Sequence, residues 1–152
     1  MEQISTKYQN VLGAYNTYIR SVEYYTFQEK TMQNSYDNSF SSDEILDGAR
    51  RSLIQAFEIF IEVLWKYLKW LLEEVCTVTL EIATPRSIIA KACEVRILSE
   101  ADTRILIELI NLRNQTSPIY KEELAVLIAH KLCSMQAHIT AIVTHCNDKD
   151  FV

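Results

Sequence analysis

The feature that most constrains the fold of this chain is its shortage of helix-breaking residues. Only two glycines and two prolines occur among 152 residues. Sheet proteins need such residues at the turns between many short strands, whereas long helices exclude them. A chain of this length usually forms one domain and buries about two-thirds of the surface that its unfolded form exposes. We therefore expect one all-α domain over residues 1–152.

Apolar residues recur at helical spacing from Tyr8 onward, which predicts a first helix ending near Phe27. The next segment, QEKTMQNSYDNSFSS, has no apolar period, and we expect a surface loop over 28–42. Ser41 with Glu44 three residues later is typical of a helix N-terminus. A second helix is therefore expected from about residue 43 to residue 76.

The remainder of the chain predicts three more helices. N-cap signals precede two of them, at Thr84 before a proline and at Ser99. The expected helices span residues 85–96, 100–113 and 121–144, and a flexible tail follows over 146–152. The simplest architecture is an up-and-down bundle of about five helices.

The second helix has an unusually wide apolar arc, covering about two-thirds of its circumference at 100° per residue. Its charged residues fall on one narrow stripe, which comprises Glu58, Glu62, Lys66, Lys69 and Glu73. One partner helix covers less than this arc. The helix is therefore either central in the bundle or part of a subunit interface, and the pattern favours neither alternative.

The charge balance excludes a general polyanion-binding surface. The chain has 15 basic and 20 acidic residues, a net charge of −5, whereas RNA or DNA binding needs clustered Lys and Arg. Residues 1–47 carry seven acidic and three basic side chains, but residues 84–121 carry six basic and four acidic ones. If an anionic ligand binds this chain, the second of these regions is the better candidate.

The cysteines and the apolar runs are typical of a cytoplasmic protein. The four cysteines are scattered without a CxxC pair, so we expect reduced thiols, no zinc site and no cofactor. The first residues, MEQISTKYQN, lack the pattern of a signal peptide. The most apolar run, 53–80, contains six charged side chains, too many for a membrane span.

Three histidines, His130, His138 and His145, lie on the last predicted helix. Spacings of eight and seven residues separate them by about 11 Å along the helix axis, too far to share one metal ion. We interpret them as solvent-facing or partly buried side chains.

The charged stripe offers a first candidate site. Glu62 precedes Lys66 by four residues, the favourable orientation for a helical ion pair. The stripe is either a solvated face or a groove in which Lys66 and Lys69 hold a nucleotide phosphate.

The segment RNQTSPIY, between the last two predicted helices, is the second candidate. It gathers a guanidinium, an amide and hydroxyls, which suits an anionic ligand. Its binding candidates are Arg113, Asn114, Ser117 and Tyr120. In the alternative interpretation Ser117 caps the last helix, Pro118 occupies its first turn, and Arg113 complements the end of the preceding helix.

Three segments, SLIQAFEIFIEVLWKYLKWLLEE, TPRSIIAKACEVRIL and LIELINLRNQTSPIYKEELAVLI, give the chain a family resemblance. Over roughly residues 48–130 it resembles the nucleotidyltransferase substrate-binding proteins, which belong with the HepT-like members of the HEPN superfamily. The matching positions include Phe57-Glu58, Glu62, Trp65-Lys66, Lys69, Pro85-Arg86, Arg113-Asn114, Ser117 and Tyr120.

The resemblance implies a helical bundle, commonly dimeric, that works beside a separate small nucleotidyltransferase. Toxin-type relatives carry Arg, four residues, His, one residue, Tyr, and cleave RNA without a metal. Arg113 and Tyr120 match this motif, but Pro118 stands at the histidine position and carries no titratable group. Loss of a general acid or base typically costs a factor of 10² to 10⁴ in rate. In some relatives the partner enzyme modifies the motif tyrosine with nucleotide, which makes Tyr120 a possible acceptor.

The leading hypothesis is a non-catalytic subunit of a toxin–antitoxin-like pair that binds substrate or nucleotide for the partner nucleotidyltransferase. We expect a homodimer or a higher oligomer. One alternative is a metal-independent HEPN ribonuclease toxin, weakened or inactivated by Pro118. Another is a purely structural or antitoxin-like bundle in which the motif is a relic.

Overall fold

The computed structural model describes residues 2–34, 40–116, 122–147 and 151, and these ranges contain six α-helices and no strand. The helices are α1 Glu2–Asn34, α2 Phe40–Trp70, α3 Pro85–Glu94, α4 Glu100–Gln115, α5 Glu122–Ser134 and α6 Gln136–His145. A π-helical segment of five residues, η1 Leu71–Val75, continues α2. The all-α bundle predicted from the shortage of glycine and proline is confirmed.

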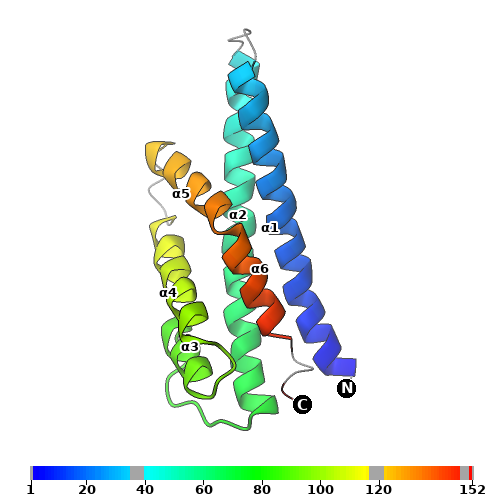
Figure 1. The fold of residues 1–152 in the computed structure, drawn as a ribbon, viewed down its shortest axis with the longest axis vertical. Coiled ribbons are helices and arrows are strands. Elements are labelled where there is room, and N and C mark those ends of the chain that lie inside the picture. The colour runs from blue at the N-terminus through cyan, green and yellow to red at the C-terminus, as the bar shows by residue number, and fades with distance from the viewer. Residues whose placement is uncertain (1, 35–39, 117–121, 148–150, 152) are drawn as a thin grey trace.

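The two longest helices, α1 and α2, form an antiparallel pair, as Figure 1 shows. The shorter α3 and α4 lie on one side of α2, and α5 and α6 cross the face of the pair. α2 contacts α1, α3, α4 and α5. Its wide apolar arc is therefore buried mainly within the chain, in agreement with the central position that was one of the two alternatives.

The core is built along α2. Phe57, Phe60 and Leu68 are fully buried, and Tyr18 from α1 stacks on Phe60 with ring centroids 6.1 Å apart. Burial of each such side chain contributes about 1.5–3 kcal/mol. These contacts hold α2 in place and leave its charged stripe partly exposed, with Lys66 and Glu73 facing solvent.

Tyrosine hydroxyls connect the α1–α2 pair to the C-terminal ends of α5 and α6. The last four carbonyls of a helix have no partner within it. Here three hydroxyls donate to carbonyls near these ends: Tyr18 to Leu132 at 2.5 Å, Tyr8 to Val143 at 2.8 Å and Tyr67 to Cys146 at 2.6 Å. These bonds fix α5 and α6 against the longer helices.

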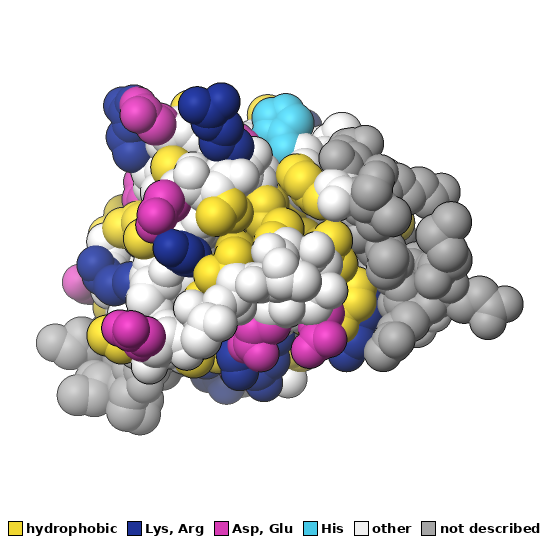
Figure 2. Space-filling view, turned by 90° about the horizontal axis from the view of Figure 1, so that it is seen from below, with side chains coloured by type: hydrophobic (Ala, Val, Ile, Leu, Met, Phe, Trp, Pro, Cys, Tyr) yellow, Lys and Arg dark blue, Asp and Glu magenta, His cyan; other side chains and the backbone are white. Residues whose placement is uncertain are grey.

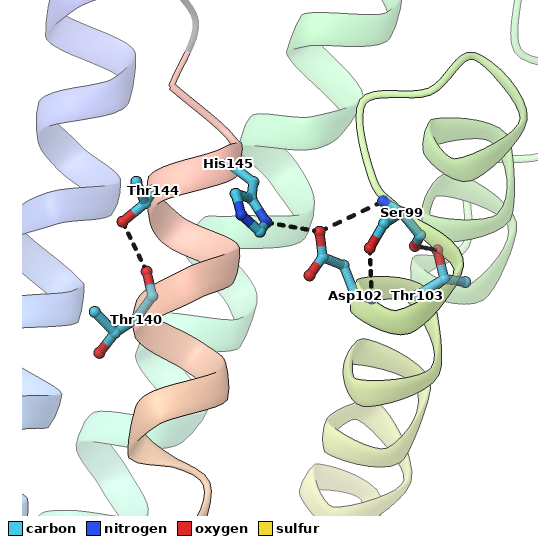
Figure 3. A network of polar contacts seen from close by, with 6 residues as sticks. All are labelled: Ser99, Asp102, Thr103, Thr140, Thr144 and His145. Carbon is cyan, nitrogen blue, oxygen red and sulfur yellow. Dashed lines mark hydrogen bonds and ion pairs between the residues drawn. The ribbon is translucent and has the colours of Figure 1, made fainter.

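Both predicted N-caps of the middle region are confirmed. The Thr84 hydroxyl accepts from the Ser87 N–H at the start of α3, and the Ser99 hydroxyl accepts from the Asp102 N–H at the start of α4. Figure 3 shows that Asp102 also pairs with His145 at the end of α6, at 3.0 Å. The N-terminus of α4 is thereby joined to the C-terminus of α6.

The predicted loop over 28–42 is wrong at both ends, because α1 continues to Asn34 and α2 begins at Phe40. Ser41 is thus inside α2 and is not its N-cap. The end of α1 carries polar residues without an apolar period, yet Glu29 is held from α5 by His130 at 2.6 Å. Such a contact across the fold cannot be recognised from the local pattern.

The last predicted helix, 121–144, is divided at Met135 into α5 and α6, so the described chain has six helices where about five were expected. The Ser134 hydroxyl donates to the Lys131 carbonyl at 2.7 Å next to this break, and α6 begins without a side-chain cap. None of the described helices is by itself long and apolar enough to cross a membrane, and α5 and α6 satisfy that test only together, across a bend of 54°.

The tail predicted over 146–152 does not begin as a free segment. Cys146 is fully buried, and Phe151 packs against the core.

Figure 2 shows the lower end of the molecule, where hydrophobic side chains gather toward the centre and charged ones of both signs lie around them. The described part of this face therefore offers no field of a single sign.

Candidate functional site

Glu62 is the centre of a polar cluster that joins α2 to the end of α4. Its carboxylate pairs with Lys66 Nζ at 3.1 Å and with Arg113 Nη2 at 3.5 Å, and it accepts a hydrogen bond from Trp65 Nε1 at 3.1 Å. The predicted Glu62–Lys66 ion pair is confirmed. The contact with Arg113 brings this arginine close to Lys66, a candidate from a separate segment of the sequence.

The surroundings of Glu62 favour its ionised form. The hydrogen bond from Trp65 lowers the pKa of Glu62, and the hydrogen bond and charge of Lys66 and the charge of Arg113 act in the same direction. Partial burial raises the pKa of Glu62, but by less than these contacts together lower it. Glu62 thus offers a stable negative charge, and a ligand anion would compete with it for Arg113 and Lys66.

Arg113 retains unused capacity to donate hydrogen bonds. Its side chain is 40% exposed, but its Nε is buried without a hydrogen-bond partner among the described residues. A guanidinium has five N–H donors in a fixed fork that matches phosphate and carboxylate oxygens. The exposed part of the guanidinium can therefore meet an additional anion beside Glu62, whereas the buried Nε is out of reach of solvent.

The C-terminus of α4 holds Arg113 in a defined position. α4 ends at Gln115, and Thr116 caps it by donating from both its N–H and its hydroxyl to the Arg113 carbonyl, at 3.0 and 2.7 Å. Asn114 lies next to it and is exposed. A positive charge at this position also complements the negative end of the helix dipole.

The other predicted site residues divide into two groups. Lys69 pairs with Glu73 at 3.7 Å, so it follows the stripe along α2 and does not join the contacts of Glu62. Ser117, Pro118 and Tyr120 lie outside the described residues. The structure thus brings Arg113 and Lys66 together at the carboxylate of Glu62.

Sequence reasoning missed two features near this cluster. Arg86 on α3 donates to the side-chain oxygen of Asn111, which stands two residues before Arg113. A hollow of about 370 Å³ also lies between α4 and α5, bordered by Asn111, Gln115, Leu124 and other residues. The family positions include Arg86, which was the one available signal. Nothing in the spacing of the sequence predicts the hollow.

The three histidines are separated, as expected from their spacing. His130 pairs with Glu29, His145 pairs with Asp102, and His138 is exposed. No group of three or more potential metal ligands occurs in the described part of the chain.

The four cysteines are free thiols, and Cys146, the most buried of them, has low reactivity. Burial, assisted by the charge of Asp102, raises the pKa of Cys146 to about 12. A thiol with such a pKa remains protonated at neutral pH and is a poor nucleophile.

Comparison with known proteins places this bundle in a family. The chain belongs to the family described as nucleotidyltransferase substrate binding protein like, whose model matches residues 10–146. The crystal structure of a protein from Thermus thermophilus is similar, with 25% sequence identity and a TM-score of 0.52. The similarity covers 81% of this chain and 98% of that one. No curated protein matches the chain.

Proposed function

We propose that this chain is a non-catalytic helical subunit that binds a substrate or nucleotide for a separate minimal nucleotidyltransferase. The observation that carries the proposal is the meeting of Arg113 and Lys66 around Glu62, in a chain that belongs to a family named for substrate binding. Two cations beside one displaceable carboxylate suit a phosphate or carboxylate ligand.

In this proposal Arg113 binds the anion bidentately and Lys66 adds a second charge. Asn114, Ser117, Tyr120 and Lys69 complete the binding surface. The assembly is a homodimer or higher oligomer in the cytoplasm and pairs with the nucleotidyltransferase in the manner of a toxin–antitoxin pair. The partner supplies the nucleotide chemistry, and Tyr120 is its possible acceptor.

The proposal is tested with the nucleotidyltransferase encoded nearest to this chain. The two proteins should co-purify, and calorimetry should detect their association. Arg113→Ala should weaken binding of the nucleotide or substrate to the complex by about tenfold or more, as expected for a charge-assisted hydrogen bond. Arg104→Ala, an exposed arginine on the same helix, is the matched control. Absence of association with excess partner would contradict the proposal.

A HEPN-type ribonuclease is the second candidate, and the matching positions of Arg113 and Tyr120 favour it. Pro118 argues against it because proline can neither accept nor donate a proton. His130, the next histidine along the chain, pairs with Glu29 on α1. If the purified chain cleaves RNA without metal and Arg113→Ala abolishes the cleavage, the chain is an enzyme and the non-catalytic proposal fails.

A further inference from the structure

A groove that shares only Lys66 with the Glu62 cluster lies between the N-terminal part of α1 and the second half of α2. Its volume is about 290 Å³, at the lower end of the range for small-molecule sites. It is lined by Lys7, Asn10, Val63, Lys66, Tyr67 and Trp70. Lys7 and Asn10 are neighbours on one face of α1, and the other four follow one face of α2 at helical spacing.

An aromatic surface forms one side of the groove. The rings of Tyr67 and Trp70 stack with centroids 6.2 Å apart and an angle of 25° between their planes. Tyr67 is buried, and its hydroxyl is fixed by the hydrogen bond to the Cys146 carbonyl. Trp70 is half-buried, so part of its indole faces the groove. A planar ligand can stack on such a surface without moving the core.

The remaining lining consists of two lysines, one amide and the apolar Val63. Lys7 is exposed and has no ion-pair partner among the described residues, and Lys66 is 61% exposed, so its ammonium group can turn from Glu62 toward the groove. The Asn10 amide adds both donors and an acceptor. The lining residues include no carboxylate. Two positive charges beside an indole are the combination that binds an aromatic ring bearing a phosphate.

We propose that this groove is a second binding site, for a nucleoside monophosphate or a similarly small planar heterocycle with one phosphate. The ring stacks on Trp70, and the phosphate lies between Lys7, Lys66 and Asn10. A volume of about 290 Å³ suits a ligand of mononucleotide size. The proposal goes beyond the proposed function, because the groove is formed without Arg113 and without the segment that follows it.

Calorimetry on the full chain, without any partner enzyme, tests the site with three probes. AMP carries both the ring and the phosphate, adenosine carries only the ring, and ribose 5-phosphate carries only the phosphate. AMP should bind at least about tenfold more tightly than either of the others, since each part contributes to affinity. Quenching of tryptophan fluorescence by AMP provides a second readout, and its loss in Trp70→Leu assigns it to Trp70 rather than to Trp65.

Two variants separate the groove from other sites. Lys7→Ala should weaken AMP binding by about tenfold through loss of a charge-assisted contact, and Trp70→Leu by about fivefold or more through loss of stacking. Lys30→Ala, an exposed lysine about 35 Å further along α1, should have no effect. Lys7 is exposed, so its replacement leaves the core intact even if Trp70→Leu impairs folding.

Three outcomes would overturn the proposal. They are absence of AMP binding, equal binding of AMP and adenosine, and binding that Lys7→Ala leaves unchanged. If Lys7→Ala instead alters the molecular mass in solution and AMP does not bind, the groove is a contact between protein chains. Arg113→Ala keeps the two proposals apart, because it should impair the proposed function and leave AMP binding in the groove intact.

Discussion

At the scale of single residues, Glu62 determines how the candidate site behaves. It occupies Arg113 and Lys66 and remains ionised because its contacts with Trp65, Lys66 and Arg113 lower its pKa. A ligand anion must take these partners from it. Glu62 therefore keeps the two cations close together and at the same time limits the affinity of the site.

Replacing this carboxylate should release both cations. Glu62→Gln retains the size and polarity of the side chain but removes its charge. Exposed ion pairs contribute about 0.2–1 kcal/mol, so the variant should bind ATP about two- to fivefold more tightly than the original chain in calorimetry. Glu58→Gln, one turn earlier on α2, should leave the affinity unchanged. Weaker binding by Glu62→Gln would mean that the carboxylate positions Arg113 rather than competes for it.

The residue types of the candidate site could be recognised from the sequence, but the contacts that join Arg113 and Lys66 at Glu62 could not. Charge and family position mark Arg113 and Lys66 as candidates, and each belongs to a separate local pattern. The contact between Glu62 and Arg113 depends on how α4 packs on α2, which no local periodicity specifies. No pattern marks Lys7, because a lone lysine resembles any solvated side chain.

At the scale of helices, two of the three N-cap signals were reliable, and the signal at Ser41 was not. Thr84 and Ser99 cap α3 and α4 as predicted, since an N-cap acts within four residues. The end of α1 is held by a partner from α5, and α6 begins after Met135 without a side-chain cap. These features lie beyond the range of periodicity arguments.

The tyrosine hydroxyls provide a test of how α5 and α6 are held. Burial raises the pKa of Tyr18 above its ordinary value, with small additional effects of Cys133 and Tyr15, so its hydroxyl stays protonated and donates to Leu132. Tyr18→Phe removes this bond, whereas the Leu132 carbonyl keeps the Met135 N–H at 3.3 Å. The variant should therefore lower the free energy of unfolding by about 0.5–1.5 kcal/mol in urea titrations. Tyr24→Phe, exposed on the same helix, should have almost no effect. An unchanged stability for Tyr18→Phe would show that the bond does not hold α5 in place.

At the scale of the whole molecule, an ionisable network joins three helices near the end of α1. Glu29 pairs with His130 on α5 and accepts from the hydroxyl of Tyr25, while Arg50 on α2 lies over the Tyr25 ring, 6.0 Å from its centroid. Burial alone would raise the pKa of Glu29. The hydrogen bonds from His130 and Tyr25, with the charges of His130 and Arg50, outweigh burial and lower it.

The lowered pKa of Glu29 makes part of the stability depend on pH. A group with a depressed folded-state pKa contributes stability above its ordinary pKa, about 4.3, and this contribution is lost as the pH falls through the folded value. Glu29→Gln should therefore be less stable than the original chain at pH 6, and the difference should shrink toward pH 3 in thermal melts. Glu23→Gln on the same helix is the control. A difference that is equal at both pH values would exclude Glu29 as its source.

The central position of α2 also determines how the molecule opens. Its buried residues contact four other helices, so its backbone amides cannot meet solvent unless most of the bundle separates. In hydrogen exchange, the amides around Phe57 to Leu68 should be the last to acquire deuterium, with a protection equal to the free energy of global unfolding. The exposed turns of α3, which has only ten residues, should exchange through smaller openings. One helix therefore reports the stability of the entire chain.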